Sequence, residues 1–564
     1  MFPNIYTSAE DLIGWDWSKY APYFDDLAGQ TLSAANVEEW LAGWTKVAFC
    51  LNEQDSRLYL ATALNIADAA AQERFNHFID EVYPQAEAAS QTLKQKLLAS
   101  GLQPAGFEIP LRNLRAEADL FRSENLPLHA EEVKLSTQYD QIVGAQTVQW
   151  QGQELTPSQL GPTFQDPERH VREQAWRTAF ERQLADRNAI NQLWQQLLAV
   201  RLKITRNAGK PDYRAYCWQE MLRFDYTPAD CASFHNAIEQ VVVPAALRVY
   251  ERRRQRLGVS SLRPWDLDVD PLNRPPLRPF KDAVQLKTTV SAMFHKLDNQ
   301  LGGYFDIMVS ENLLDLENRK NKAPGGFCTS FAVVKRPFIF MNAVGLQDNV
   351  MTLLHESGHA FHVFESAHLP FAQQYEVPAE FAEVASMSME LLATPYLAAD
   401  QGGFYSQADA RRAMVEQLEG MITFWPYMAV VDAFQHWVYE NPEKSSDPGQ
   451  CDATWNKLWD RFMPGVDWSG LEDFEVTGWQ RKLHILTSPF YYVEYGLAYL
   501  GAAQVWRNSL ADQAAAVASY RQALALGGTR SLPQLYQAAG ARLAFDTEIL
   551  YDVITLIEDY LEEK

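Results

Sequence analysis

The sequence predicts a mainly α-helical protein with a small amount of β-sheet. Apolar residues recur at three- and four-residue spacing with Gln, Glu and Arg between them, which is typical of amphipathic helices. The clearest such segments are residues 37–48, 58–82, 179–209 and 230–257. A chain of 564 residues is too long for one hydrophobic core, because cores stop growing near about 250–300 residues. We therefore expect two or more packed regions.

Short segments with the pattern of strands interrupt the helices. Residues 146–156 alternate apolar and polar side chains around Gln151-Gly152, which predicts a β-hairpin. Residues 336–342 form a short apolar run next to a proline, which favours an edge strand over a helix. Between them, the Pro-rich residues 263–280 cannot be helical throughout. We place the main boundary there, between an N-terminal helical region (1–262) and a region that carries the chemistry (263–564).

Composition and charge narrow the class of protein. With 47% hydrophobic and 21% charged residues, the chain is neither disordered nor a small disulfide scaffold. Its net charge of −23 argues against a general nucleic-acid binder or a binder of anionic membranes. No signal peptide and no membrane-length apolar run is evident. The five cysteines are scattered and odd in number, which is typical of reduced thiols, so we expect a cytoplasmic protein.

Residues 355–359 read HESGH and contain the pattern HExxH. In a helix, His355 and His359 project from the same face and can bind one metal ion. Glu356 is rotated by about 100°, so it lies beside the metal, where it can take a proton from water. Zinc accepts imidazole and carboxylate ligands, keeps a position open for water in catalytic sites and lowers the pKa of that water toward about 7. We therefore expect one Zn²⁺ per chain, with Glu356 as the general base.

A third ligand is expected from residues 376–394, a predicted helix with several glutamates on one face. A loop of about a dozen residues can bring this helix against the first, with Glu383 facing the two histidines. Glu380 or Glu390 would then lie one or two turns away and orient a ligand imidazole. His362 also falls on the histidine face, where a packed or orienting residue is favoured over a ligand.

These motifs resemble those of the thimet oligopeptidase and oligoendopeptidase F zinc metallopeptidases, most closely the oligoendopeptidase F branch. HESGHAFH (355–362) is similar to the family's HExGHxxH, and AEFAEVASMSMELL (379–392) is similar to its downstream segment. PGGFC (324–328) and PFIFMN (337–342) resemble the loop and edge strand that precede the zinc helix. With looser matches further upstream, the resemblance covers roughly residues 130–560.

The resemblance implies zinc on His355, His359 and Glu383, with Glu356 as general base. It also implies a large helical ellipsoid with a deep central substrate channel, one wall of which is formed by residues 1–262. A small β-sheet would lie near the zinc helix. Such a channel would admit unfolded oligopeptides and exclude folded proteins.

Peptide recognition is expected ahead of the zinc helix. The predicted edge strand around Phe338 could pair with the backbone of an extended peptide. Gly325 and Gly326 would allow that peptide to approach closely.

Residues 484–495 resemble the family's downstream His/Tyr element. A Ser-Pro pair at residues 488–489 predicts a helix start, so Tyr492 and Tyr495 would share a face. Together with His484, their hydroxyls would bind the developing oxyanion, a contribution of about 3–4 kcal/mol per well-placed donor. Tyr491 is a further candidate, for substrate binding.

We therefore expect a zinc-dependent endopeptidase that hydrolyses internal bonds of short unstructured oligopeptides. Two alternatives stay open. One is a zinc carboxypeptidase or dipeptidyl carboxypeptidase on the same helical plan. The other is a non-catalytic peptide-binding protein with a structural metal, which the intact Glu356 argues against. The sequence indicates no oligomeric state.

Overall fold

The computed structural model of the protein describes residues 5, 6, 8–319, 321–323 and 325–563. The chain divides into two compact units that are interleaved along the sequence. Unit 1 comprises Met1–Asp119, Leu277–Met414 and Ala498–Leu543, and unit 2 comprises Leu120–Pro276, Val415–Leu497 and Ala544–Lys564. The predicted boundary between residues 262 and 263 separates two functional regions, and it stays a prediction.

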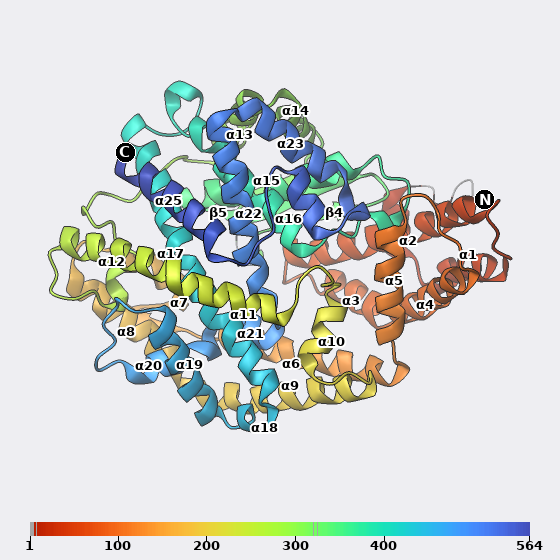
Figure 1. Ribbon diagram of the computed structural model, residues 1–564, viewed down its shortest axis with the longest axis horizontal. Coiled ribbons are helices and arrows are strands. Elements are labelled where there is room, and N and C mark those ends of the chain that lie inside the picture. The colour runs from red at the N-terminus through yellow and green to blue at the C-terminus, as the bar shows by residue number, and fades with distance from the viewer. Residues whose placement is uncertain (1–4, 7, 320, 324, 564) are drawn as a thin grey trace. The chain divides into compact units, whose positions relative to one another are not determined.

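Unit 1 is built mainly from helices, with one sheet next to them (Figure 1). Its elements are α1 (Trp17–Gly29), α2 (Val37–Leu64), α3 (Ala69–His77), α4 (Tyr83–Ser100), α5 (Glu108–Leu120), α13 (Ala283–Leu297), α14 (Asn299–Ser310), β3 (Leu314–Glu317), β4 (Phe327–Phe331), β5 (Arg336–Ala343), α15 (Gln347–Ser366), α16 (Ala379–Ala393), α23 (Gln513–Ala525) and α24 (Leu532–Ala538). The last residue of α5 is assigned to unit 2.

Unit 2 is also mainly helical and contains one short hairpin. Its elements are α6 (Leu126–Gly144), β1 (Val148–Trp150), β2 (Gln153–Leu155), α7 (Pro157–Leu160), α8 (Arg169–Ala185), α9 (Arg187–Asn207), α10 (Tyr213–Glu220), α11 (Pro228–Ala237), α12 (Val243–Leu257), α18 (Pro442–Ser445), α19 (Pro448–Phe462), α20 (Glu472–Val476), α21 (Leu483–Thr487) and α25 (Thr547–Glu563). Helices α17 (Gln407–Glu440) and α22 (Tyr492–Ala511) have residues in both units.

The predicted mainly α-helical fold with a small β-sheet is confirmed. Two predicted helices are interrupted. Within residues 58–82, α2 ends at Leu64 and α3 begins at Ala69. Within residues 179–209, α8 ends at Ala185 and α9 begins at Arg187. Asp68 caps the start of α3, since its carboxylate accepts the backbone N–H groups of Ala70 and Ala71 at 3.0 Å. No helix among the described residues is long and apolar enough to cross a lipid bilayer.

The predicted hairpin at residues 146–156 is confirmed. Strands β1 and β2 pair antiparallel, with Trp150 opposite Gln153. Gln151 and Gly152 form the turn with φ values of 50° and 81°. Positive φ at both central residues is the conformation that matches the twist of a two-residue hairpin.

The second sheet corrects one prediction. Its strand order is β3-β5-β4, so β5 is the central strand and pairs with neighbours on both sides. The prediction of an edge strand at residues 336–342 is therefore wrong, and the two edges of the sheet are β3 and β4. The apolar run of β5 is explained by burial of five consecutive residues, 337–341, as expected for a strand covered on both faces.

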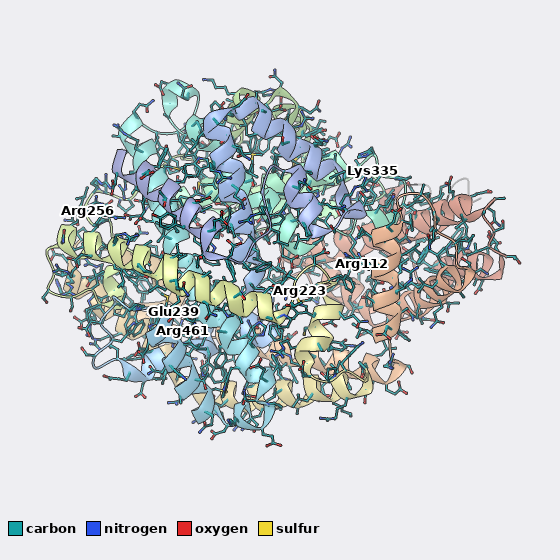
Figure 2. All side chains as sticks on the ribbon, in the orientation of Figure 1. Arg112, Arg223, Glu239, Arg256, Lys335 and Arg461 are labelled. Atoms are coloured by element: carbon teal, nitrogen blue, oxygen red, sulfur yellow. The ribbon has the colours of Figure 1, made fainter. Side chains whose placement is uncertain are left out.

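Each unit has its own apolar core. In unit 1, helices α1, α2, α4 and α5 bury a cluster that includes Trp40, Trp44 and Phe107. In unit 2, Trp176 and Trp265 pack edge to face at 5.7 Å. Ion pairs also connect distant parts of unit 2, for example Glu239 with Arg461 of α19 at 2.5 Å (Figure 2).

Candidate active site

Helix α15 follows directly from the central strand β5 and carries the HESGH residues. Asn349 fixes the connection, because its side-chain oxygen accepts the backbone N–H groups of Val344 and Leu346 at 2.8 and 3.1 Å. This amide is largely buried in the first turn of the helix. The register of the histidines relative to the sheet is thereby set at the start of α15.

Helices α15 and α16 approach each other closely at Gly358. A Cβ atom at this position would lie 2.5 Å from the Cα of Ser386 and 2.6 Å from the carbonyl oxygen of Ala385. Contacts this short do not occur, so only glycine permits the approach. Tyr520 of α23 holds the opposite helix, because its hydroxyl donates to the same Ala385 oxygen at 2.8 Å. The Gly within HESGH thus sets the distance from the histidines to α16.

This approach brings the three predicted metal ligands together. His355, His359 and Glu383 each offer one ligand atom, and these atoms lie within 4.8 Å of one another. The Nε2 atoms of His355 and His359 are 3.4 and 3.9 Å from Oε2 of Glu383. These separations exceed the 2.7–3.2 Å of N–H···O hydrogen bonds. They are near the distance of about 3.3 Å between two ligands that a tetrahedral zinc holds at about 2.0 Å. The donor set and its spacing therefore fit a zinc ion.

Glu390 orients the first histidine. Its Oε1 lies 2.7 Å from Nδ1 of His355, which leaves Nε2 directed at Glu383. Ser386 steadies Glu383 in turn, by donating its hydroxyl to Oε2 at 3.1 Å. Of the two glutamates predicted to orient a ligand, the structure therefore places Glu390 against His355 through its side chain.

The other two predicted supporting residues lie elsewhere on the helices. Glu380 is buried in the first turn of α16, before Glu383. The ring of His362 packs against Phe381 at 6.0 Å between centroids, and its Nε2 has no hydrogen-bond partner in the described part of the chain. Burial lowers the pKa of His362 to about 3, so the ring is neutral. It behaves as a packed residue.

The electrostatics favour a cation between the two helices. Burial alone lowers the pKa of His355, but Glu383 and Glu390 outweigh it and raise the pKa to about 10. Burial raises the pKa of Glu383, but the nearby imidazoles of His355 and His359 lower it to about 2. Two buried carboxylates thus surround one imidazole, and such charges need a compensating partner.

Glu356 lies next to this group and against the edge strand β4. Burial raises the pKa of its carboxyl to about 7, while His355 and a backbone hydrogen bond from Cys328 act in the opposite direction. Its side chain is mostly buried, at 7% exposed. A carboxyl that titrates near neutral pH is suited to accept and release protons.

Tyr499 is a further residue at this site that the sequence did not indicate. Burial first, and then the charges of Glu390 and Glu383, raise the pKa of its hydroxyl well above the usual value. It lies on α22, one turn beyond Tyr495. This four-residue spacing from a predicted functional tyrosine was the signal that could have identified it.

The predicted peptide-binding residues lie around β4 and β5. Gly325 and Gly326 precede β4, and Gly325 has a φ of 90°, a conformation that favours glycine. Phe338 lies on the central strand, opposite Thr329 of β4, and is 9% exposed. Pro324 of the same motif lies outside the described residues. Strand β4 is one edge of this sheet, and β3 is the other.

The predicted His/Tyr element forms a cluster within unit 2. The ring centroid of His484 lies 5.0 Å from that of Tyr492, 5.9 Å from Tyr495 and 6.1 Å from Tyr491. Tyr492 and Tyr495 are 5.6 Å apart, as expected for neighbours on one helix face. Burial, with the charge of Lys482, lowers the pKa of His484 to about 4, so its imidazole is neutral at pH 7.

The start of the helix that carries these tyrosines differs from the prediction. Helix α22 begins at Tyr492 and not at the Ser-Pro pair, because Phe490 has a φ of 64°. Gln435 accepts the N–H of Phe490 at 2.7 Å, and Arg223 donates to its carbonyl at 2.7 Å. A left-handed conformation at a bulky residue is strained and persists where its surroundings hold it.

Arg223, labelled in Figure 2, thus contacts the backbone just before the tyrosines, and no local sequence pattern indicated this contact. Its guanidinium also donates to Glu494 of α22 at 2.6 Å, and the two side chains are 1% and 2% exposed. A buried pair of this kind fixes a single geometry when both partners are present.

Replacing Glu390 with Gln tests the orienting role. We expect zinc affinity to fall about 10–100-fold, since loss of such a partner leaves the imidazole free to turn. Isothermal titration of the metal-free protein with Zn²⁺ measures it. Glu365→Gln, on α15 and paired with Arg521 at 2.7 Å, is the control. Equal zinc affinity in the two variants would contradict the role of Glu390.

Comparison with known proteins gives consistent matches. The family model described as peptidase family M3 matches residues 163–553. An oligoendopeptidase F homolog from Lactococcus lactis subsp. lactis (strain IL1403) is 26% identical over 156 residues, which are 28% of this chain and only 25% of that relative.

Solved structures extend the similarity over the whole chain. One assigned as oligoendopeptidase F superposes with a TM-score of 0.89 at 27% identity and covers 98% of this chain and 97% of its own. PZ peptidase A with an inhibitor gives a TM-score of 0.87 at 27% identity, covering 100% of this chain and 98% of its own. The resemblance drawn from the motifs is confirmed by these matches.

Proposed function

The chain belongs to peptidase family M3, the metallopeptidases, and from this premise we propose that it is a zinc-dependent endopeptidase of short unstructured oligopeptides. The observation that carries the proposal is the convergence of His355, His359 and Glu383 across the α15–α16 contact. The buried Glu356 beside them supports peptide hydrolysis over simple peptide binding, because a purely structural metal needs no base.

In the proposed reaction, His355, His359 and Glu383 would hold the zinc. When bound, zinc supplies Lewis-acid polarisation of the scissile carbonyl and acidifies the attacking water. Glu356 takes the proton of that water and passes it to the leaving amine. Glu390 keeps Nε2 of His355 directed at the site through its bond to Nδ1.

We assign oxyanion stabilisation to the His/Tyr cluster. Tyr492, Tyr495 and the neutral His484 each carry a donor that can bind the oxygen of the tetrahedral intermediate. The spacing of their rings and the buried Arg223–Glu494 pair behind them support a fixed arrangement. Tyr491 is assigned to substrate binding.

We place the peptide along β4. This strand is an edge of its sheet, and edge strands accept an extended peptide as an added strand. Gly325 and Gly326 lead into β4, where the absence of side chains permits a close approach. Phe338 would then contribute through its packing under β4 and not by pairing with substrate.

We also propose a cytoplasmic location. The five cysteines all lie within the described residues and form no disulfide there, and four of them are buried. Reduced cysteines of this kind are typical of proteins in a reducing compartment.

Mass spectrometry of the products from an internally quenched peptide, blocked at both ends, tests the proposed function. We expect internal cleavage, its loss in the presence of a chelator and its return with added Zn²⁺. No cleavage of the blocked peptide, with stepwise loss of C-terminal residues from an unblocked one, would favour the carboxypeptidase alternative. Binding of both peptides without cleavage by the zinc-loaded protein would favour the non-catalytic alternative.

The pH dependence follows from the base. Because Glu356 acts as a carboxylate, kcat/KM rises with pH as the carboxyl loses its proton. Burial raises its pKa to about 7, and a nearby metal cation lowers it, so the rise is centred at or below about pH 7. Initial rates at low substrate concentration from pH 5 to 9 measure this limb. An acidic limb centred well above pH 7 would contradict the assignment.

A further inference from the structure

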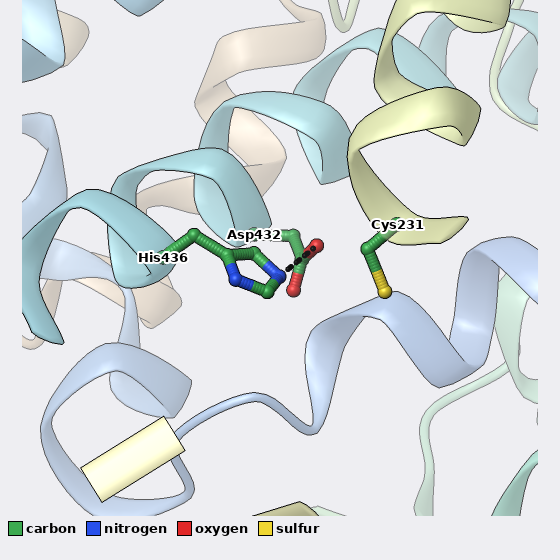
Figure 3. Close-up of side chains that lie close together, drawn as sticks. All are labelled: Cys231, Asp432 and His436. Atoms are coloured by element: carbon green, nitrogen blue, oxygen red, sulfur yellow. Dashed lines mark ion pairs between the residues drawn. The ribbon is translucent and has the colours of Figure 1, made fainter. Parts of the chain in front are cut away.

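A second group of metal-binding side chains lies within unit 2, formed by α11 and α17. Cys231, Asp432 and His436 each offer one ligand atom, the atoms lie within 4.8 Å of one another, and all three residues are buried (Figure 3). Asp432 and His436 are four residues apart on α17, so they share a face of that helix. Cys231 comes from α11, which also carries His235 one turn later.

We propose that Cys231, Asp432 and His436 bind a second divalent cation of the zinc type, and that His235 orients Asp432. The Nε2 of His235 lies 2.7 Å from Oδ2 of Asp432, which is a hydrogen bond to the carboxylate. Bonds of this kind commonly hold a metal-binding carboxylate in place.

The spacing of the donors supports a cation between them. Nε2 of His436 lies 3.4 Å from Oδ2 of Asp432, too long for a good hydrogen bond. The same 3.4 Å separates His355 from Glu383 at the proposed catalytic site. Two ligands held at about 2.0 Å by a tetrahedral zinc are about 3.3 Å apart. The two sites thus share the donor spacing of a metal centre.

The burial of polar atoms gives independent support. Asp432 is 0% exposed, and within the described part of the chain neither its Oδ1 nor Nε2 of His436 has a hydrogen-bond partner. A buried carboxylate with an unsatisfied oxygen is costly. A cation bound by Oδ1 or Oδ2 and by Nε2 would satisfy these atoms together.

The donor chemistry indicates zinc. Thiolate, imidazole and carboxylate are all zinc ligands, whereas calcium and magnesium prefer oxygen alone. Aromatic rings close the site, since Trp218 and Phe490 lie 5.6 and 5.2 Å from the ring of His436.

The position of the site suggests what it stabilises. Phe490, which packs on His436, is the strained residue that precedes the tyrosines of α22. A metal on His436 would hold this ring in place and brace the turn before Tyr491. The inference concerns metal binding and does not depend on the proposed peptidase activity.

Cobalt substitution tests the proposal without measuring activity. The full-length protein is freed of metal and titrated with Co²⁺ while near-ultraviolet absorption and bound metal are recorded. A thiolate ligand gives a charge-transfer band, which the His355–His359–Glu383 site cannot give because it has no sulfur. We expect two bound Co²⁺ per chain and one such band. Zinc content of the protein as purified gives an independent count, expected at two.

Matched variants assign the band. Cys231→Ser is expected to abolish it and to remove one metal, whereas Cys451→Ser, at another buried thiol of unit 2, keeps both. His359→Ala is expected to remove the other metal and keep the band. A wild-type protein that binds metal without the band, or a band that survives Cys231→Ser, would overturn the proposal. The first result would show that the cluster is a buried Asp–His network only, and the second that a different thiol binds the metal.

Discussion

Replacing Glu356 with Gln is expected to lower kcat about 10²–10⁴-fold, the usual contribution of a general base. Gln has the shape of Glu but cannot accept a proton from water. Glu356 is not one of the three residues whose ligand atoms converge on the metal position. We therefore expect the zinc content of the variant to stay at the wild-type level. Measurement of kcat and KM on a blocked peptide, with zinc analysis of the same sample, checks both expectations.

The matched control for this variant is Glu365→Gln on the same helix. Glu365 pairs with Arg521 at 2.7 Å, so the change removes a carboxylate of α15 without touching the proposed base. We expect it to keep wild-type kcat. A zinc-loaded Glu356→Gln protein as active as this control would remove Glu356 from the role of base.

Replacing Gly358 with Ala is expected to separate α15 from α16. The new Cβ would lie 2.5 Å from Cα of Ser386, so the helices must move apart by about 1 Å to reach normal contact. Overpacking of this kind costs about 1–3 kcal/mol of stability. The same movement takes His355 and His359 away from Glu383, so we expect zinc affinity to fall at least about tenfold. Urea unfolding and zinc titration measure the two effects.

Gly420→Ala is the control for this second variant. Gly420 lies within the long helix α17, and a Cβ there would have no atom within 4 Å in the described structure. Since Ala is the better helix former, we expect a small gain of about 0.5–1 kcal/mol. Gly358→Ala could instead give the same gain in stability and leave zinc affinity unchanged. The close contact between α15 and α16 would then not determine the geometry of the metal site.

The sequence predicted the parts of the site that depend on local pattern. HExxH placed His355, Glu356 and His359 on one helix, and the face of the next helix contained Glu383. Which of Glu380 and Glu390 orients a ligand histidine depends on how α16 is rotated about its axis relative to α15. Gly358 and Tyr520 set that rotation through tertiary contacts. Helical spacing alone cannot determine that rotation.

Features that depend on contacts distant in sequence were missed. The start of α22 depends on Gln435 and Arg223, which bind the backbone of Phe490 from 55 and 267 residues away. The central place of β5 likewise depends on β3 and β4, two strands of only four and five residues. The cluster of Cys231 with Asp432 and His436 joins helices far apart in the chain. Local propensity has no information about such pairings.

The most direct test of the central claim is anomalous diffraction at the zinc edge from crystals of the zinc-loaded protein. The account predicts a peak at about 2.0–2.2 Å from Nε2 of His355, Nε2 of His359 and a carboxylate oxygen of Glu383. Glu356 should lie beside the peak and outside its ligand shell. A fully active, zinc-loaded crystal with no peak between α15 and α16 would contradict the account.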